Sequence, residues 1–172
     1  MQIIIMSDNH RDEDIVREVL KQNPQADRYY LLGDSEMRKH VLVNLEVISV
    51  KGNFPFEPRL PKELILTIDD IRVLMVHGHK QHVKTGIERI KQYARDKNAQ
   101  LVFFGHTHHY RIYDAGDMIL VNPGSLSLPR GHYEKTYAKV TINKNHTNVE
   151  IIDVDNQKTL NSFEKILGEN DG

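Results

Sequence analysis

QIIIM at residues 2–6, followed at once by the polar group SDNH at residues 7–10, contains the pattern that decides the fold. Short apolar runs that are nearly uninterrupted and rich in β-branched or aromatic residues are typical of strands buried on both faces. Each such run in this chain is closed by polar or glycine-containing residues, which mark where the strand ends. The later examples are RYYLL-GD (28–34), VISV-KGN (47–53), VLMV-HGH (73–79), LVFF-GHTH (101–108) and ILV-NPGS (119–125).

Helical periodicity separates some of these strands. Residues 12–22 carry apolar side chains at helical spacing with Asp12 as the expected N-cap, and residues 84–97 do so again up to Asn98. Strands that alternate with helices predict a largely parallel sheet with right-handed crossovers.

The remaining segments predict hairpins, a terminal helix and a loop. Residues 64–69 and 71–76 flank an Asp69-Asp70 turn and are expected to form a hairpin. Residues 54–61 contain three prolines, which favours a stiff connecting loop over a substrate cap. The other expected elements are strands at 118–121, 137–142 and 149–154, a turn at 143–145, a helix at 160–167 and a frayed end at 168–172.

Composition excludes several classes of protein. A length of 172 residues predicts a single domain over 1–172. The 23 basic and 24 acidic residues nearly cancel, so no bulk charge favours nucleic acid or an anionic membrane. The chain has no cysteine, which excludes disulfides and thiolate metal sites. Without a long apolar span or a secretion signal at its start, it is expected to be cytoplasmic.

Histidine is the anomaly, with ten in the chain, and several of them follow the expected strands. Ligands of an open parallel sheet bind beyond the carboxyl ends of its strands, so we expect a cluster of donors at one rim of one sheet. Histidines that are merely hydrogen-bonded at strand ends would require five independent coincidences. The expected metal ligands are Asp8, His10, Asp34, Asn53, His77, His106 and His108.

Seven donors exceed one four-coordinate site, so two ions are expected, with Asp34 as the shared carboxylate. Nitrogen and oxygen ligands without sulfur suit divalent Mn, Fe, Zn, Ni or Co, with Mn²⁺ favoured. Two ions about 3.5–4 Å apart suit phosphoryl hydrolysis, because a water between them loses a proton readily and attacks phosphorus in line. Asp34, Asn53 and His77 are the expected catalytic residues.

The ordered motifs D-x-H (8–10), GD (33–34), GN (52–53), HG (77–78) and GHTH (105–108) resemble the calcineurin-like metallophosphoesterase superfamily. The short length, VHGH (76–79) and NPGS (122–125) are most similar to its small bacterial and archaeal phosphodiesterases. The resemblance implies an α/β fold: a four-layer αββα sandwich of two mixed β-sheets flanked by helices. It also assigns Asp8, His10, Asp34 and His108 to one ion, Asp34, Asn53, His77 and His106 to the other, and Asn9 to the substrate.

One departure from the family pattern affects catalysis. The family commonly has G-N-H-D, whereas this chain has Gly52-Asn53-Phe54-Pro55 and lacks the histidine that protonates the leaving group. General-acid help is worth about 10²–10⁴-fold, so activated phosphodiesters should be preferred over alkyl monoesters. His79 and His109 are candidate substitutes, although a neighbouring or surface role is favoured for each. The NPGS segment is either a tight turn or a support for the metal ligands.

Two other functions compete with a phosphodiesterase. The same small fold serves as a retromer subunit, a non-catalytic scaffold with an eroded ligand set, whereas all seven ligand positions are intact here. An enzyme that uses one metal on another bond is disfavoured because it leaves Asn53 and several histidines without roles. The expected partner is a small phosphodiester, and a homo-oligomer is compatible with the sequence.

Overall fold

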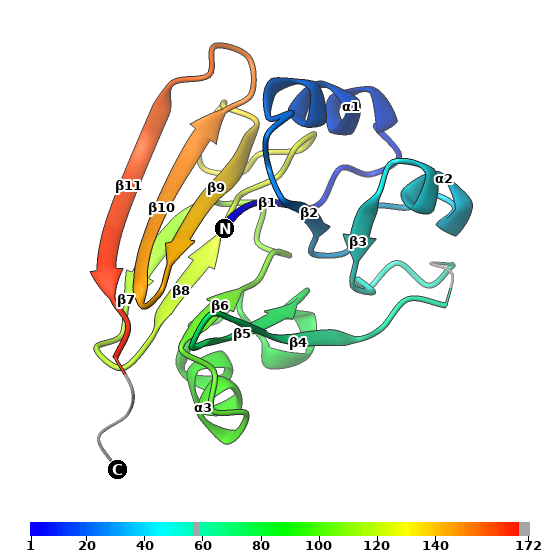
Figure 1. The fold of residues 1–172 in the computed structure, drawn as a ribbon. Helices are drawn as coiled ribbons and strands as arrows, with labels where there is room; N and C mark the ends of the chain where they lie inside the picture. Colours follow the sequence, from blue (N-terminus) through cyan, green and yellow to red (C-terminus); the bar gives the residue numbers. More distant parts are fainter. Residues whose placement is uncertain (57–58, 169–172) are drawn as a thin grey trace.

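Two β-sheets pack face to face and carry helices on both outer faces, as seen in the computed structural model, which describes residues 1–56 and 59–168 (Figure 1). The layers are therefore helix, sheet, sheet, helix. This arrangement confirms the expected four-layer sandwich of mixed sheets. Within the described residues, no helix is long and apolar enough to cross a bilayer.

The first sheet has six strands in the order β11-β10-β9-β1-β2-β3. Strands β1, β2 and β3 are parallel, with β3 at the edge, and β9 joins β1 antiparallel. Two helices, α1 (Glu13–Gln22) and α2 (Lys39–Asn44), cover its outer face (Figure 1). The strands are β1 (Gln2–Met6), β2 (Arg28–Leu31), β3 (Val47–Ser49), β9 (Thr136–Asn143), β10 (His146–Asp153) and β11 (Thr159–Ile166).

The second sheet has five strands in the order β4-β5-β6-β8-β7. Here β5, β6 and β8 are parallel, and β4 and β7 are antiparallel edge strands. Helix α3 (Glu88–Asp96) covers its outer face, and the short helix η1 (His79–Gln81) follows β5 (Figure 1). The strands are β4 (Glu63–Ile68), β5 (Ile71–Val76), β6 (Leu101–Phe103), β7 (Arg111–Asp114) and β8 (Ile119–Asn122).

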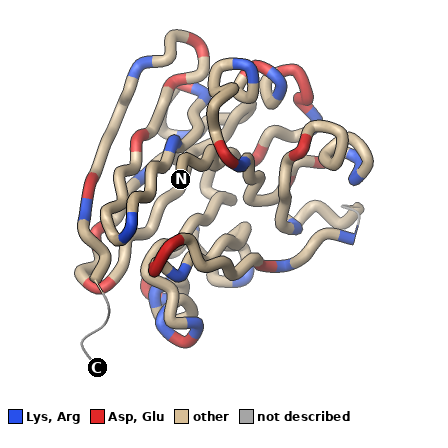
Figure 2. Tube along the Cα trace, viewed as in Figure 1, with Lys and Arg blue, Asp and Glu red and all other residues tan. Residues whose placement is uncertain are grey.

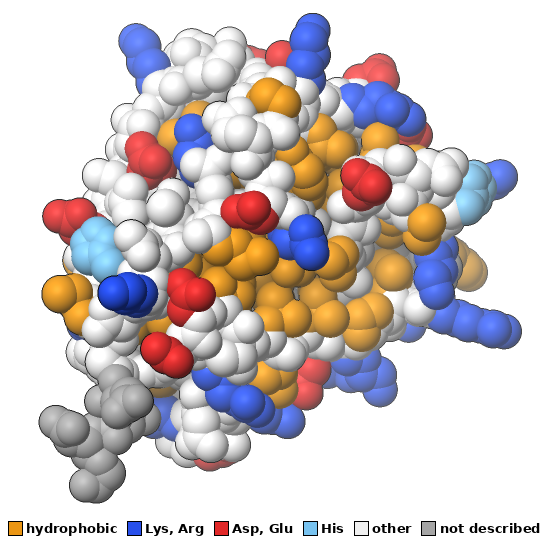
Figure 3. Space-filling model, in the orientation of Figure 1, with side chains coloured by type: hydrophobic (Ala, Val, Ile, Leu, Met, Phe, Trp, Pro, Cys, Tyr) orange, Lys and Arg blue, Asp and Glu red, His pale blue; other side chains and the backbone are white. Residues whose placement is uncertain are grey.

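The uninterrupted apolar runs follow from this layering. Successive side chains of a strand point to opposite faces, and both faces of each sheet are covered. Ile3 and Ile5 lie in the core between the sheets, whereas Ile4 and Met6 pack beneath α1. Hydrophobic side chains are visible across the middle of the face shown in Figure 3, surrounded by charged ones.

The helix boundaries show where local signals were sufficient. The Asp12 side chain accepts a hydrogen bond from the backbone N–H of Ile15 at 3.1 Å, which confirms it as the N-cap of α1. Helix α3 begins at Glu88 rather than at residue 84. Asn98 adopts a left-handed conformation just beyond α3, as expected for a helix stop.

The expected helix over residues 160–167 is wrong, because this segment is strand β11. It pairs antiparallel with β10 along most of its length, and Phe163 packs against the core between the sheets. The apolar spacing mimics a helix, but the unpaired edge of β10 supplies backbone partners that local propensity cannot anticipate. Of the end expected to fray, residues 169–172 lie outside the described residues. Neither α2 nor β7 was among the expected elements.

The expectation of one sheet rim is also wrong, although both predicted hairpins are confirmed. The parallel strands are divided, three in each sheet, because the β4–β5 hairpin starts a second sheet. The donors therefore come from two sheets that face each other. The described residues of the 54–61 segment form no helix or strand, in keeping with a connecting loop.

We expect Phe103→Ala to lower the free energy of unfolding by about 3–5 kcal/mol, because this fully buried ring fills the space between the sheets. Phe56, which is 83% exposed, is the matched control, and Phe56→Ala should change stability by less than about 0.5 kcal/mol. Urea denaturation followed by circular dichroism measures both. Equal effects would contradict the assigned core.

Candidate metal centre

All seven expected ligands lie in loops that follow the carboxyl ends of parallel strands, and contacts between them join the two sheets. They are Asp8 and His10 after β1, Asp34 after β2, Asn53 after β3, His77 after β5, and His106 and His108 after β6. Loops separated by up to about a hundred residues along the chain thus meet at one place.

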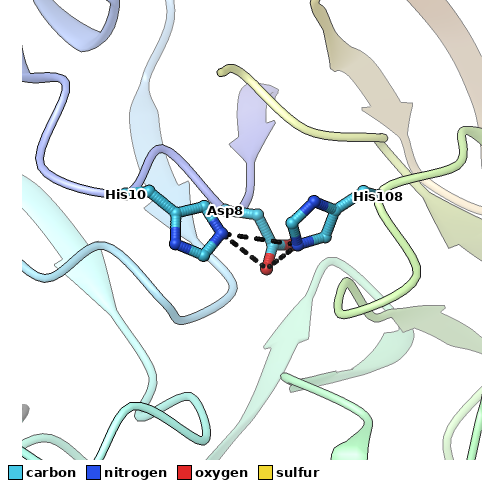
Figure 4. A group of neighbouring side chains, drawn as sticks. All are labelled: Asp8, His10 and His108. Carbon is cyan, nitrogen blue, oxygen red and sulfur yellow. Dashed lines mark hydrogen bonds and ion pairs between the residues drawn. The ribbon is translucent and has the colours of Figure 1, made fainter. Parts of the chain in front are cut away.

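One group of donors comprises Asp8, His10 and His108, which point toward one another (Figure 4). The Nε2 atoms of His10 and His108 are 3.4 Å apart. Asp8 Oδ1 is 3.2 Å from His108 Nε2 and 4.0 Å from His10 Nε2. Atoms this close, each with a lone pair directed inward, can share one cation.

A second group comprises Asp8, Asp34 and His77. His77 Nε2 lies 3.9 Å from Asp8 Oδ1 and 3.5 Å from Asp34 Oδ2. Asn53 Oδ1 is 2.9 Å from the same nitrogen, and His106 Nδ1 is 3.2 Å from it. All seven predicted ligands therefore converge on two adjoining groups.

The carboxylate common to both groups is that of Asp8, whereas the sequence predicts Asp34 as the shared ligand. Asp34 Oδ1 accepts a hydrogen bond from the backbone N–H of Phe54 at 3.0 Å, and its Oδ2 faces His77. In the structure, Asp8 thus lies between the two groups and Asp34 belongs to the second group alone. The bridging role of Asp34 stays a prediction.

The Asp8 carboxylate shows that the site fits a cation. Asp8 is fully buried, and among the described residues its Oδ1 has no hydrogen-bond partner. Its Oδ2 accepts hydrogen bonds from the Ser7 hydroxyl and from the backbone N–H of His106. A buried carboxylate oxygen without a donor is costly unless a positive charge compensates it. Oxygen and imidazole donors without sulfur suit a borderline or hard divalent metal.

Three histidines are anchored through Nδ1, which directs Nε2 of each ring toward the other candidate ligands. Nδ1 of His77 donates to the carbonyl of Leu32 at 2.7 Å, and Nδ1 of His108 donates to the carbonyl of Leu128 at 2.8 Å. Nδ1 of His10 lies 2.8 Å from a carboxylate oxygen of Glu36. Anchoring one ring nitrogen fixes the tautomer and aims the other at a metal, as is typical of metal-binding histidines.

Glu36 is a residue of the candidate site that the sequence did not single out. Its second oxygen forms an ion pair with Arg11 Nε at 3.0 Å, so Glu36 joins Arg11 to the candidate ligand His10. The sequence shows only an acidic residue two positions after Asp34. This did not predict a contact with His10, because only the fold brings the loops after β1 and β2 together.

The NPGS segment proves to be both a turn and a support. Gly124 has a positive φ, as a tight turn requires, and Ser125 donates its hydroxyl to the carbonyl of Asp8 at 2.7 Å. Asn122 Nδ2 donates to the carbonyl of Gly105 at 3.0 Å and to Thr107 Oγ1 at 2.8 Å. The segment therefore holds the loops after β1 and β6.

Backbone strain is concentrated at the site. Five of the seven ligands have positive φ angles, an uncommon conformation for residues other than glycine. Such residues persist only where surrounding contacts hold them, and they cluster at functional sites. The five are Asp8 (54°), His10 (43°), Asp34 (48°), His106 (68°) and His108 (60°).

Two glycines allow the ligand loops to approach one another. A Cβ on Gly52 would lie 2.0 Å from Asp34 Oδ1, and a Cβ on Gly105 would lie 2.7 Å from Asp8 Oδ2. Real side chains do not tolerate such distances, so each glycine makes room for a carboxylate that lies in another loop. The motifs GN and GHTH therefore need glycine for packing as well as for turning.

Electrostatics shift the pKa values of the adjacent His77 and His106 in opposite directions. Burial opposes protonation of His77, but Asp34 and Asp8 outweigh it and raise its pKa above 6.5. Burial and the neighbouring His77 lower the pKa of His106 to about 4. Burial of Asp34 is likewise outweighed by its contacts with His77, and its pKa lies below the ordinary value.

Asn9, His79 and His109, the candidates for contact with the substrate or its leaving group, have different surroundings. Asn9 is fully buried and its Nδ2 donates to the carbonyl of Asp12 at 3.2 Å, so it holds the turn before α1. A substrate contact by Asn9 stays a prediction. His79 is half-buried beside the centre, with its ring centroid 5.4 Å from that of His77. His109 is exposed, and its Nδ1 donates to the carbonyl of Arg130.

Comparisons with known proteins agree with this geometry. A profile of the calcineurin-like phosphoesterase superfamily domain matches residues 1–145. The probable metallophosphoesterase YsnB of Bacillus subtilis is 29% identical over 170 residues, which cover 93% of this chain and 100% of that protein.

Two solved structures have the same fold. A conserved uncharacterised protein from Streptococcus pneumoniae, described as a predicted phosphoesterase, superposes with a TM-score of 0.84 at 29% identity, covering 95% of this chain and 97% of that chain. A Vps29 variant from Entamoeba histolytica superposes with a TM-score of 0.78 at 17% identity, covering 96% and 98% of the two chains. The second likeness shows the fold alone.

Gly52→Ala is expected to displace the Asp34 carboxylate and to reduce bound metal at least tenfold, because its Cβ has no room. Gly168→Ala is the control, since nothing lies within 4 Å of a Cβ placed there. Metal content after dialysis against Mn²⁺, measured by atomic emission, gives the result. Full metal content in a folded Gly52→Ala protein would contradict the close packing of the loops.

We expect histidine titration in the metal-free protein, followed by NMR, to give His77 a pKa above 6.5 and His106 a pKa of about 4.

The raised pKa of His77 means that its ion pairs stabilise the metal-free fold below pH 6.5, and that this contribution is lost as pH rises through the His77 pKa. Because a metal needs the neutral ring, metal affinity should rise over the same range. Asp34→Asn should lower the pKa of His77. A His106 that titrates above His77 would refute this order.

Proposed function

The chain belongs to the calcineurin-like phosphoesterase superfamily, and from that premise we propose that it is a phosphodiesterase that uses two divalent metal ions, with Mn²⁺ favoured. The observation that carries the proposal is the convergence of seven oxygen and nitrogen donors, with the buried Asp8 carboxylate common to both groups. Two adjoining groups of donors support two ions better than one.

The residues divide between binding the ions and keeping the ligands in place. Asp8, His10 and His108 would hold one ion, and Asp34, Asn53, His77 and His106 would hold the other, with one carboxylate shared. When bound, such a pair of ions activates water as a nucleophile and neutralises charge on the phosphoryl oxygens. In the hydrolysis, one P–O ester bond breaks and one P–O bond to the water oxygen forms. One water proton goes to solvent or to the leaving oxygen.

Phe54 supports the preference for diesters with good leaving groups. Its backbone N–H holds Asp34 Oδ1, so this position keeps a structural role at the centre. Its ring lies beneath the Arg11 guanidinium, 5.7 Å from centroid to Cζ, and offers no proton. A leaving group that departs as a stable anion needs no proton, whereas an alkoxide does.

Metal content and hydrolysis test the proposal together. We expect close to two equivalents of metal and release of nitrophenolate from bis(4-nitrophenyl) phosphate at least a hundredfold faster than hydrolysis of an alkyl monoester. Asp34→Asn should reduce the rate at least a hundredfold with an unchanged circular dichroism spectrum. Asp70→Asn, in the exposed β4–β5 turn, is the control and should leave the rate unchanged.

Three outcomes would contradict the proposal. An Asp34→Asn variant with full activity would exclude a role for that carboxylate. A clear preference for the alkyl monoester would exclude the diester specificity. A protein that binds no metal and hydrolyses neither ester would favour the non-catalytic scaffold function.

A further inference from the structure

A cavity of about 610 Å³ opens beside the candidate metal centre, and it is in the size range of small-molecule sites. His77 belongs both to its wall and to the second group of candidate ligands, and Asn53, which contacts His77, lies in the same wall. The cavity therefore continues from the centre toward the β3–β4 connection, η1 and α3. A group bonded to a phosphoryl held at the centre could extend into it.

The wall of this cavity is positively charged. Lys51, Lys62 and Lys80 line it, and Glu63 is its one acidic residue among the part of the chain that the structure describes. Lys51 and Lys62 lie at the two ends of the β3–β4 connection, which shows blue segments in Figure 2, and Lys80 lies in η1. These lysines come from the β3–β4 connection and from η1, and all three line the same cavity.

The single acidic residue is already neutralised. Glu63 accepts a hydrogen bond from the Tyr93 hydroxyl and forms an ion pair with Lys97 Nζ at 3.3 Å. Lys51, Lys62 and Lys80, in contrast, have no carboxylate within 4.0 Å among residues 1–56 and 59–168. The charge of the cavity is therefore available to a ligand.

The overall charge does not explain this accumulation. The chain has a net charge of −1, and Figure 2 shows both signs distributed over most elements. Arg11, whose guanidinium lies over the Phe54 ring, is paired with Glu36, which also contacts His10. Among the described residues, the three lysines of the cavity wall thus differ from Arg11 in having no carboxylate partner.

We propose that the cavity selects phosphodiesters whose non-reacting ester arm carries a second anionic group, held by Lys51, Lys62 and Lys80. Phe54 and Val76 in the same wall provide apolar contact for the arm that joins the two anionic groups. Carboxylate and phosphate share the required charge. The proposal rests on the proposed function, because the scissile phosphoryl must sit at the metal centre.

Three esters that release the same 4-nitrophenolate test this specificity with the Mn²⁺-loaded protein. Their other arms are propyl, 2-carboxyethyl and 3-phosphopropyl, so the arm is neutral, a carboxylate or a phosphate. We expect kcat/KM to be about fivefold to tenfold higher for the anionic arms, mainly through KM, as a few partly screened ion pairs would supply. The advantage should fall as KCl is raised from 50 mM to 500 mM, because salt screens exposed charges.

The double variant Lys62→Gln/Lys80→Gln is expected to bring the three esters to within twofold of one another. For each protein the rates with the anionic arms are divided by its own rate with the propyl ester, so that the ratio reports the charge of the arm alone. Lys21→Gln, in the last turn of α1, removes one positive charge away from the cavity and should keep the full advantage. A higher kcat/KM for the phosphate arm alone would show that the cavity recognises phosphate. A higher kcat/KM for both anionic arms would show that it recognises negative charge in general.

Binding gives a readout that does not depend on hydrolysis. Calorimetric titration of the metal-free protein with inorganic pyrophosphate should show an affinity that the double variant weakens at least fivefold and Lys21→Gln does not. Equal affinity in all three proteins, or none in the natural chain, would overturn the proposal.

The kinetic outcomes separate the two proposals. Hydrolysis of the propyl ester with no advantage for either anionic arm would overturn the cavity specificity and leave the phosphodiesterase in place. An advantage that survives in the double variant would overturn it equally. Failure to hydrolyse any of the esters would count against the phosphodiesterase, and the pyrophosphate titration would then decide the cavity.

Discussion

The burial of the Asp8 carboxylate is the constraint on which the centre depends. Ser7 and the backbone N–H of His106 satisfy one of its oxygens, while the other faces the imidazoles of His77 and His108 without a hydrogen bond. Keeping a buried carboxylate in this state requires compensating positive charge. The two sheets, the strained loops and the close-packed glycines all hold this oxygen where a cation can reach it.

The same packing holds the loops of the centre in place. Ser125 holds the Asp8 carbonyl, and Asn122 holds the loop that carries the two histidines after β6. Phe54 illustrates a position with two separable roles. Its backbone N–H holds Asp34 Oδ1, a contact that does not depend on which side chain the position carries, whereas its ring lies beside Arg11.

Local sequence signals predicted much of the fold because their physical cause is local. Asp12 caps α1 through a hydrogen bond three residues away, and Asn98 ends a helix through its own backbone conformation. Residues 160–167 show the opposite case. Their apolar spacing suits a helix, yet they form β11 because the edge of β10 provides backbone partners that no window of local sequence contains.

The sequence by itself determined most of the strands, their polar ends and the seven candidate ligands, because an apolar run closed by Asp, Asn or His encodes both a buried strand and a donor at its tip. Only the tertiary structure decided that these strands divide between two sheets, that Asp8 is the carboxylate common to both groups, and that Glu36 orients His10. The physical reason is the separation along the chain of the groups that interact. Burial and hydrogen-bonding capacity belong to each residue, whereas a shared oxygen or an anchoring contact depends on loops that meet only after the sheets have packed.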